Sequence, residues 1–200
     1  MLRFNDEFIP PGAGAALTGL DQLAWLFQHG RPTEKEPALR RLILAAAESV
    51  LAACLAATDL ATVQLAAAGF WECGLNEKGP EARRRKDEGV ERLSAGDLAG
   101  VQKIFHGLSV KHPDWAEAIN KKATVLYLRG RAGESLALCR RVVEMKPHHF
   151  GAWNGMALCA VQLEYWHTAL DAAKRALSLQ PGATVNLETI RLAKSKLAAP

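Results

Sequence analysis

Two adjacent histidines, His148 and His149, are the side chains of this sequence that most directly suggest a metal or catalytic site. Neighbouring residues on a helix point about 100° apart, so an adjacent pair does not present two ligands to one metal unless other ligands converge on it. No HxxxH pattern accompanies the pair, and it directly follows Pro147, where a helix is expected to end. We therefore interpret the histidines as part of a joint between helices.

The four cysteines also lack the spacing of a reactive or metal-binding site. They are separated by 19, 66 and 20 residues, with no CxxC and no Cys/His pair at zinc-ligand spacing, which predicts reduced thiols in a non-oxidising compartment. We expect Cys54, Cys139 and Cys159 to be buried, and Cys73, near a helix end, to be the candidate for reactivity. The sequence has no Gly-rich phosphate loop, GxSxG elbow or carboxylate pair. It predicts no enzyme activity, no cofactor and no metal.

Composition and charge define the class of protein in which these residues sit. The 200 residues are 49% hydrophobic and 23% charged, which predicts a folded, soluble chain. Residues 1–80 have net charge −3 and residues 81–200 have net charge +7, so an acidic or anionic partner is expected for the second half. The amino-terminal sequence is typical of neither a signal peptide nor a transit peptide, and no apolar run has membrane length. We expect the cytoplasm or an organellar matrix or stroma.

An internal repeat organises the second half of the chain. Pro113, Pro147 and Pro181 are 34 residues apart, and the windows 82–115, 116–149 and 150–183 each contain two apolar segments of helical length. Proline cannot continue the preceding helix and pushes the residue before it towards extended geometry. Each window therefore predicts a pair of helices that ends at its proline. In the first joint, Asp114 and Glu117 have the spacing of a capping box.

The repeat resembles the tetratricopeptide repeat, a helix-turn-helix of 34 residues. The likeness depends on the period, the small column Gly89, Ala123 and Ala157, an aromatic residue at Phe105, and the closing prolines. The chain is also similar to small stand-alone tetratricopeptide proteins of bacteria and plant organelles. The resemblance implies an all-α, right-handed solenoid of three repeats.

The segments that flank the repeats predict a domain at residues 1–80 and a repeat domain at 81–200. Residues 183–199 have Leu187, Ile190, Ala193 and Leu197 on one helical face and predict a solvating cap helix. Residues 37–57 and 59–73 predict an Ala-rich helical hairpin, with Asp59 as an N-cap. We expect a short helix at 20–29 and loops at 9–14 and 30–37.

The first helices of the repeats are expected to line a concave groove that binds a partner. Helical spacing places nine candidate residues there: Lys86, Val90, Leu93, Asn120, Lys121, Thr124, Tyr127, Asn154 and Leu158. The two asparagines could hold a peptide backbone, because an amide offers a donor and an acceptor, or they could simply face water. Some tetratricopeptide proteins bind the carboxylate tail of heat-shock chaperones through a five-residue clamp. Only Lys86 matches that clamp, so the resemblance does not favour chaperone tails.

A run of basic residues leaves a second hypothesis open. Arg83, Arg84 and Arg85 could form an anionic-ligand patch, but acids at helical spacing surround them, which favours a solvated helix face. The sequence therefore predicts a protein-interaction adaptor or assembly factor with a peptide or protein partner. An RNA-binding repeat protein and a structural subunit of a larger complex are the alternatives. The sequence leaves the oligomeric state open.

Overall fold

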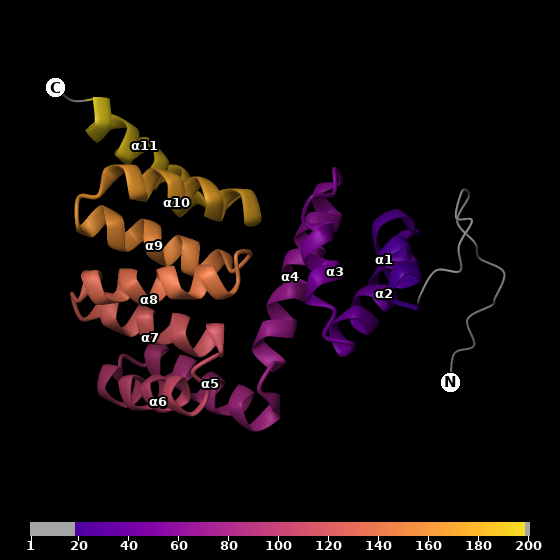
Figure 1. Cartoon of the computed structure of the whole chain (residues 1–200), viewed down its shortest axis with the longest axis horizontal. Helices are drawn as coiled ribbons and strands as arrows, with labels where there is room; N and C mark the ends of the chain where they lie inside the picture. Colours follow the sequence, from indigo (N-terminus) through magenta and orange to yellow (C-terminus); the bar gives the residue numbers. More distant parts are fainter. Residues whose placement is uncertain (1–18, 199–200) are drawn as a thin grey trace.

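The computed structural model describes residues 19–198, which form eleven α-helices and no strand (Figure 1). Helices α5 to α11 lie one above another in a stack, and α1 to α4 form a bundle beside that stack. The all-α solenoid predicted from the repeat is confirmed. The helices are α1 (Gly19–His29), α2 (Pro32–Leu44), α3 (Glu48–Cys54), α4 (Leu60–Asn76), α5 (Gly79–Ser94), α6 (Leu98–Lys111), α7 (Ala116–Leu128), α8 (Ala132–Met145), α9 (Phe150–Gln162), α10 (Trp166–Leu179) and α11 (Thr184–Ala198).

The 34-residue period is visible in the helix boundaries. Helices α7, α9 and α11 begin at residues 116, 150 and 184, and α6, α8 and α10 begin at 98, 132 and 166. Helices α6, α8 and α10 each end just before a proline. Their C-cap residues are His112, Lys146 and Gln180, which have φ between −135° and −130° and ψ between 74° and 85°. This is the extended geometry that a following proline imposes.

Close packing within a repeat depends on the small column. A methyl group added to Gly89 on α5 would lie 2.6 Å from Cζ of Phe105 on α6. Phe105 is fully buried, and Ala123 and Ala157 in the same column are each 1% exposed. The small residues therefore let the paired helices approach until larger side chains fill the space between them.

The amino-terminal bundle contains more helices than the predicted hairpin. The expected helix at 37–57 is divided into α2 and α3 by a turn in which Ala46 has φ of 49°. Helix α2 begins at Pro32, inside the predicted loop 30–37, because proline is favoured in the first helical turn and Arg31 and Glu34 close a capping box around it. The short helix expected at 20–29 is confirmed as α1. The loop expected at 9–14 lies outside the described residues.

Helix α4 connects the bundle to the repeats. Its predicted N-cap is confirmed, since the Asp59 carboxylate accepts hydrogen bonds from the backbone N–H groups of Ala61 and Thr62 at 3.3 and 3.1 Å. Near the end of the helix, the Gly74 carbonyl accepts a 2.8 Å hydrogen bond from the indole of Trp115, which is fully buried. None of the helices between residues 19 and 198 has the length and apolar character needed to cross a membrane. We propose residue 80 as the boundary between the amino-terminal helical region and the repeat domain.

The last helix, α11, packs on α9 and α10 with a different face from the predicted one. Its buried residues are Asn186, Thr189 and Ala193, whereas Leu187 is 39% exposed. The prediction that Leu187 lies on the packed apolar face is therefore wrong. Thr189 satisfies its hydroxyl by donating to the carbonyl of Val185 at 2.9 Å, which allows a polar residue on the packed side.

Candidate functional site

His149 forms the joint between the second and third repeats. Its Nδ1 accepts a 3.1 Å hydrogen bond from the backbone N–H of Ala152, so His149 is the N-cap of α9. A neutral imidazole with an accepting Nδ1 carries its proton on Nε2. We therefore assign Nε2–H as the donor to Oε2 of Glu117, 3.2 Å away on α7. No group of three or more His, Cys, Asp or Glu side chains that could hold a metal is found within residues 19–198.

Glu117 is a buried carboxylate held by two partners. It is 3% exposed, and Lys121 lies one helical turn further along α7 with its Nζ 3.3 Å from Oε1. Burial raises the pKa of Glu117, but the hydrogen bond from His149 and the charge of Lys121 outweigh it, so the pKa lies below its ordinary value. The predicted capping box is wrong, because Glu117 turns towards His149 while Asp114 pairs with Lys78 at 2.6 Å.

Trp71 of α4 covers this joint from the side of the amino-terminal bundle. Its ring centroid lies 5.2 Å from that of His149 and 4.9 Å from that of Phe150, and Nζ of Lys121 lies 5.8 Å from the ring centroid. A cation above an indole face is attracted by the ring quadrupole. Helix α4 therefore lies against the amino-terminal ends of α7 and α9.

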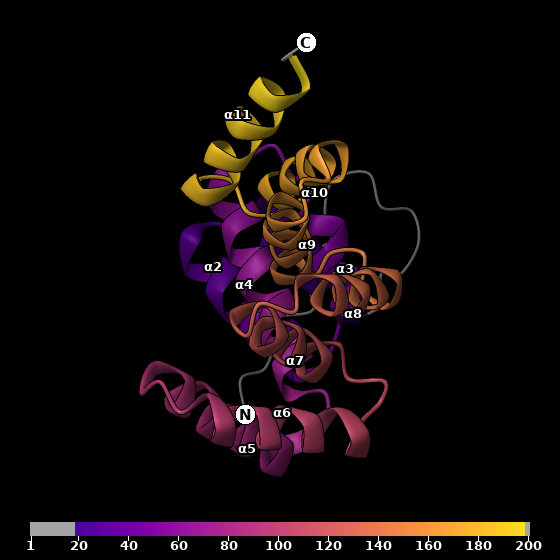
Figure 2. The same ribbon diagram turned by 90° about the vertical axis from the view of Figure 1, so that its left-hand side faces the viewer.

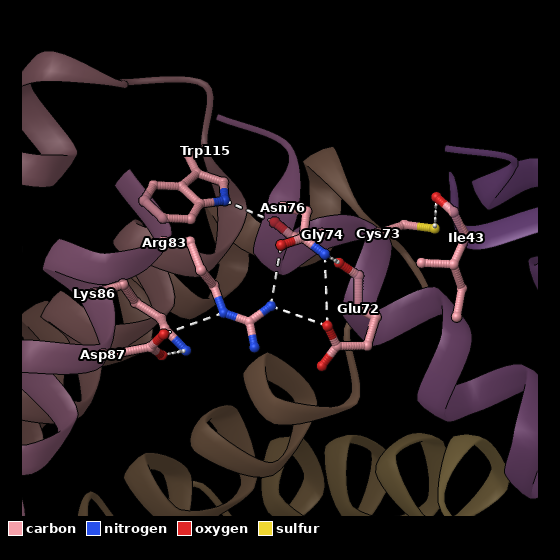
Figure 3. Close-up of polar contacts among 9 residues, drawn as sticks. All are labelled: Ile43, Glu72, Cys73, Gly74, Asn76, Arg83, Lys86, Asp87 and Trp115. Atoms are coloured by element: carbon pink, nitrogen blue, oxygen red, sulfur yellow. Dashed lines mark hydrogen bonds and ion pairs between the residues drawn. The ribbon is translucent and has the colours of Figure 1, made fainter. Parts of the chain in front are cut away.

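The predicted anionic patch is divided by the structure. Figure 3 shows Arg83 pointing towards α4, where NH1 lies 2.9 Å from Glu72 and 3.2 Å from Asn76. Arg83 also pairs with Asp87 on its own helix at 3.2 Å. Arg85 is paired with Glu88. The pairing favours the solvated helix face that the surrounding acids predicted over an anionic patch, and within the described residues Arg84 is the one of the three arginines that forms no ion pair.

The nine predicted groove residues separate into three sets. Lys86 and Asn120 are buried, at 6% and 5% exposure, and the ammonium group of Lys86 pairs with Asp87 at 2.5 Å. Neither is displayed to a ligand, which corrects their assignment to an open groove. Lys121 is engaged with Glu117. The remaining six are partly exposed: Val90, Leu93, Thr124, Tyr127, Asn154 and Leu158.

Cys73 does not have the environment of a reactive thiol. It is 4% exposed, and its sulfur lies 3.9 Å from the carbonyl oxygen of Ile43. Burial raises its pKa to about 11, and the nearby charge of Glu48 acts in the same direction. The structure therefore does not favour Cys73 as the candidate for reactivity, and all four cysteines are buried free thiols.

The fold and these joints define a helical-repeat protein whose units are stacked helix pairs. No family model matches the chain. A TPR repeat-containing protein of Rhizobium etli is 31% identical over 86 residues, which are 43% of this chain and 42% of that protein. The chain thus matches less than half the length of this curated relative.

Solved structures share the fold at low sequence identity. The first TPR of Spaghetti bound to an HSP90 peptide has a TM-score of 0.56 and 15% identity, with 59% of this chain and 94% of that chain covered. The Sgt2 TPR domain of Aspergillus fumigatus has a TM-score of 0.55 and 14% identity, with 59% and 80% covered. The TPR2B domain of yeast Sti1 in complex with an Hsp70 peptide has a TM-score of 0.54 and 18% identity, with 57% and 97% covered. The present chain therefore has the fold of tetratricopeptide-repeat domains.

Proposed function

We propose that this protein is an interaction module that holds a peptide segment of a partner protein against α5, α7 and α9. One observation carries the proposal. Two columns of side chains, each spaced by 34 residues, stay partly exposed in every repeat: Val90, Thr124 and Leu158, and Leu93, Tyr127 and Val161. The neighbouring column of Gly89, Ala123 and Ala157 is buried in every repeat. We call the six partly exposed residues the inner surface.

The inner surface is apolar and hydroxyl-bearing rather than charged. The two cations predicted beside it, Lys86 and Lys121, are paired with Asp87 and Glu117. At its edge, Oδ1 of Asn154 is buried and has no hydrogen-bond partner among the described residues. An unpaired buried carbonyl is costly, so a backbone N–H that reached it after a small rotation of the side chain would be stabilising. These features favour a ligand with apolar side chains and a free backbone edge.

The comparisons support this function at the level of the fold. The Spaghetti and Sti1 domains are described as bound to chaperone peptides, which indicates that helix pairs stacked in this way can serve as peptide receptors. The adaptor or assembly-factor role is therefore our proposal for this chain, without a named partner. An RNA-binding role is less favoured, because Arg83 and Arg85 are paired with carboxylates and are not free for phosphates.

Selection from a random dodecapeptide library displayed on phage tests the proposal directly. We expect the wild-type protein to enrich peptides with apolar positions, and Leu158→Glu to lose affinity for them by roughly tenfold or more, because a carboxylate at a hydrophobic contact is desolvated without a partner. Leu44→Glu is the matched control, because Leu44 is 86% exposed and lies on α2, away from the inner surface.

Circular dichroism should first show that both variants remain folded. If the enriched peptides bind wild type and Leu158→Glu equally, the inner surface is not the receptor. If no peptide is enriched, the proposed peptide-binding function is wrong, and the structural-subunit alternative becomes the better account.

A further inference from the structure

The first repeat has a pocket on the side that lies away from the rest of the stack. Helices α5 and α6 form one end of the stack, with no repeat beyond them (Figures 1 and 2). A pocket of about 600 Å³ opens between these two helices and the start of the following loop. We call it the edge pocket. None of its lining residues belongs to the inner surface, so the two sites are separate.

The repeat register identifies this side as a stacking face. Arg84 lines the edge pocket, and the residues 34 and 68 positions further along are Ala118 and Ala152, which are both fully buried. Ala118 belongs to the same buried cluster as Phe105 of the preceding repeat. In the second and third repeats, the column of Arg84 therefore faces the repeat that comes before. In the first repeat, an exposed guanidinium occupies this column.

The walls of the edge pocket are predominantly cationic. Arg84, Arg85, Lys103, Lys111 and His112 line it, against the carboxylates of Glu81 and Glu88. Those carboxylates are engaged, since Glu81 lies 3.4 Å from Lys111 and Glu88 pairs with Arg85. Arg84 and Lys103 are exposed, and neither forms an ion pair or a side-chain hydrogen bond with a residue of the described chain. Two free cations therefore flank the opening.

The floor of the edge pocket is apolar. It is formed by Ala82, Ile104 and Leu108, which are each 4–5% exposed and belong to the core of the first repeat. Gly107 also lines the pocket, and a methyl group added there would meet nothing within 4 Å. An apolar strip bordered by cations complements a helix that has an apolar stripe bordered by acids.

We propose that the edge pocket binds an acidic amphipathic helix of a partner protein, which packs on α5 and α6 in the place that a preceding repeat would take. A solvating end face accounts for polar residues here, but not for a pocket with an apolar floor and unpaired cations of one sign. Single-stranded RNA fits less well, because the lining contains no Phe, Tyr or Trp on which a base could stack.

Fluorescence anisotropy with a labelled synthetic peptide tests this proposal. The probe is a helix of about 16 residues, with leucines at i, i+3, i+4 and i+7 and glutamates on both flanks of that stripe. A second peptide carries lysines in place of the glutamates. We expect the full chain to bind the acidic peptide at least about tenfold more tightly than the basic one, and more weakly as salt is added.

Two pairs of variants locate the binding site. Arg84→Glu/Lys103→Glu should weaken binding of the acidic peptide by about tenfold or more, whereas Arg140→Glu/Lys174→Glu, the same charge change on α8 and α10, should not. Gly107→Trp should fill the pocket and abolish binding. Gly133→Trp is its control, because Gly133 is also an exposed helical glycine at which an added methyl group would meet nothing within 4 Å. Melting curves confirm that each variant is folded.

Several results would overturn the inference. Equal affinity for the acidic and basic peptides, or unchanged binding by Gly107→Trp, would show that the edge pocket is not the receptor. If the wild-type protein does not bind the acidic peptide at low salt, the edge pocket is only part of a solvent-facing end of the stack. If a labelled oligouridylate binds and is lost with Arg84→Glu/Lys103→Glu while the acidic peptide fails, the surface is a nucleic-acid site. None of these results depends on peptide binding to the inner surface.

Discussion

The hydrogen bond between His149 and Glu117 is expected to hold the second and third repeats together, and a double-mutant cycle measures its strength. The perturbations are His149→Asn, Glu117→Gln and the double variant. Asparagine is a favourable N-cap, so His149→Asn can still accept from the N–H of Ala152 while losing the donor to Glu117. Glu117→Gln keeps the shape of the side chain and removes its charge.

The structure sets the size of the effect. Both partners are buried, at 6% and 3% exposure, and the acceptor is a carboxylate. A hydrogen bond to a charged group contributes about 1.5–3 kcal/mol, and removal of one partner from a buried pair costs about 3–5 kcal/mol. Nζ of Lys121 lies 3.3 Å from the carboxylate and remains as its partner in His149→Asn. We therefore expect that variant to lose about 3 kcal/mol of the free energy of unfolding. The expected coupling energy is about 1.5–3 kcal/mol.

Urea unfolding followed by circular dichroism supplies the four free energies, and an unchanged m-value shows that the same surface is exposed in each variant. His149→Asn also removes the ring contact with Trp71. This loss occurs whether residue 117 is Glu or Gln, so its free energy cancels in the cycle. A coupling energy below about 0.5 kcal/mol would refute the assignment of Nε2–H as a strong donor, because that is the range of independent sites.

The pH dependence of stability provides a second readout of the same pair. The pKa of Glu117 is lower in the folded protein than its ordinary value, so the unfolded chain binds the proton more readily. The contribution of Glu117 is therefore present above about pH 4 and is lost as the pH falls through the folded-state pKa. We expect the stability of Glu117→Gln to decline less than that of wild type below about pH 4. An identical decline in both proteins would argue against the lowered pKa.

Three further predictions concern the core and the cysteines. Trp115→Ala should lower the free energy of unfolding by about 3–5 kcal/mol in urea titrations, because the indole is fully buried and bonded to Gly74; a loss below about 1 kcal/mol would contradict this packing. Gly89→Ala should destabilise by about 1–3 kcal/mol through the clash with α6, whereas Gly107→Ala, on an open helix face, should stabilise by roughly 0.5–1 kcal/mol; the same sign for both would refute the close-approach argument. Cys73 should resist iodoacetamide at about pH 8 in the native protein and react in urea, followed by mass spectrometry, and rapid native labelling would show that the thiol is accessible.

The repeat architecture could be predicted because its signals are local. The prolines at 113, 147 and 181 end helices wherever they occur, and the small column at Gly89 marks a close approach of paired helices. The N-cap at Asp59 was predictable for the same reason, since it requires only the next three residues. Each of these features follows from residues within one helical turn or one repeat.

The environment of the candidate groove could not be predicted in the same way. Helical spacing assigned Val90 and Thr124 to one column, but it gave no information on whether another part of the chain would lie against the start of α7. Trp71 lies there, over a pair of residues, Glu117 and Lys121, that in an isolated repeat would be an ordinary surface ion pair.

The ion pairs in the structure show which basic residues of the second half remain free to attract an anionic ligand. Residues 81–200 carry a net charge of +7, which alone suggests a general attraction for anions. Beside the inner surface, Lys86 and Lys121 are both paired with carboxylates, so they do not attract an anionic ligand there. Unpaired cations remain at the edge pocket, on Arg84 and Lys103. Salt should therefore weaken association at the edge pocket while leaving peptide binding on the inner surface nearly unchanged, so the two proposed sites can be distinguished in one titration.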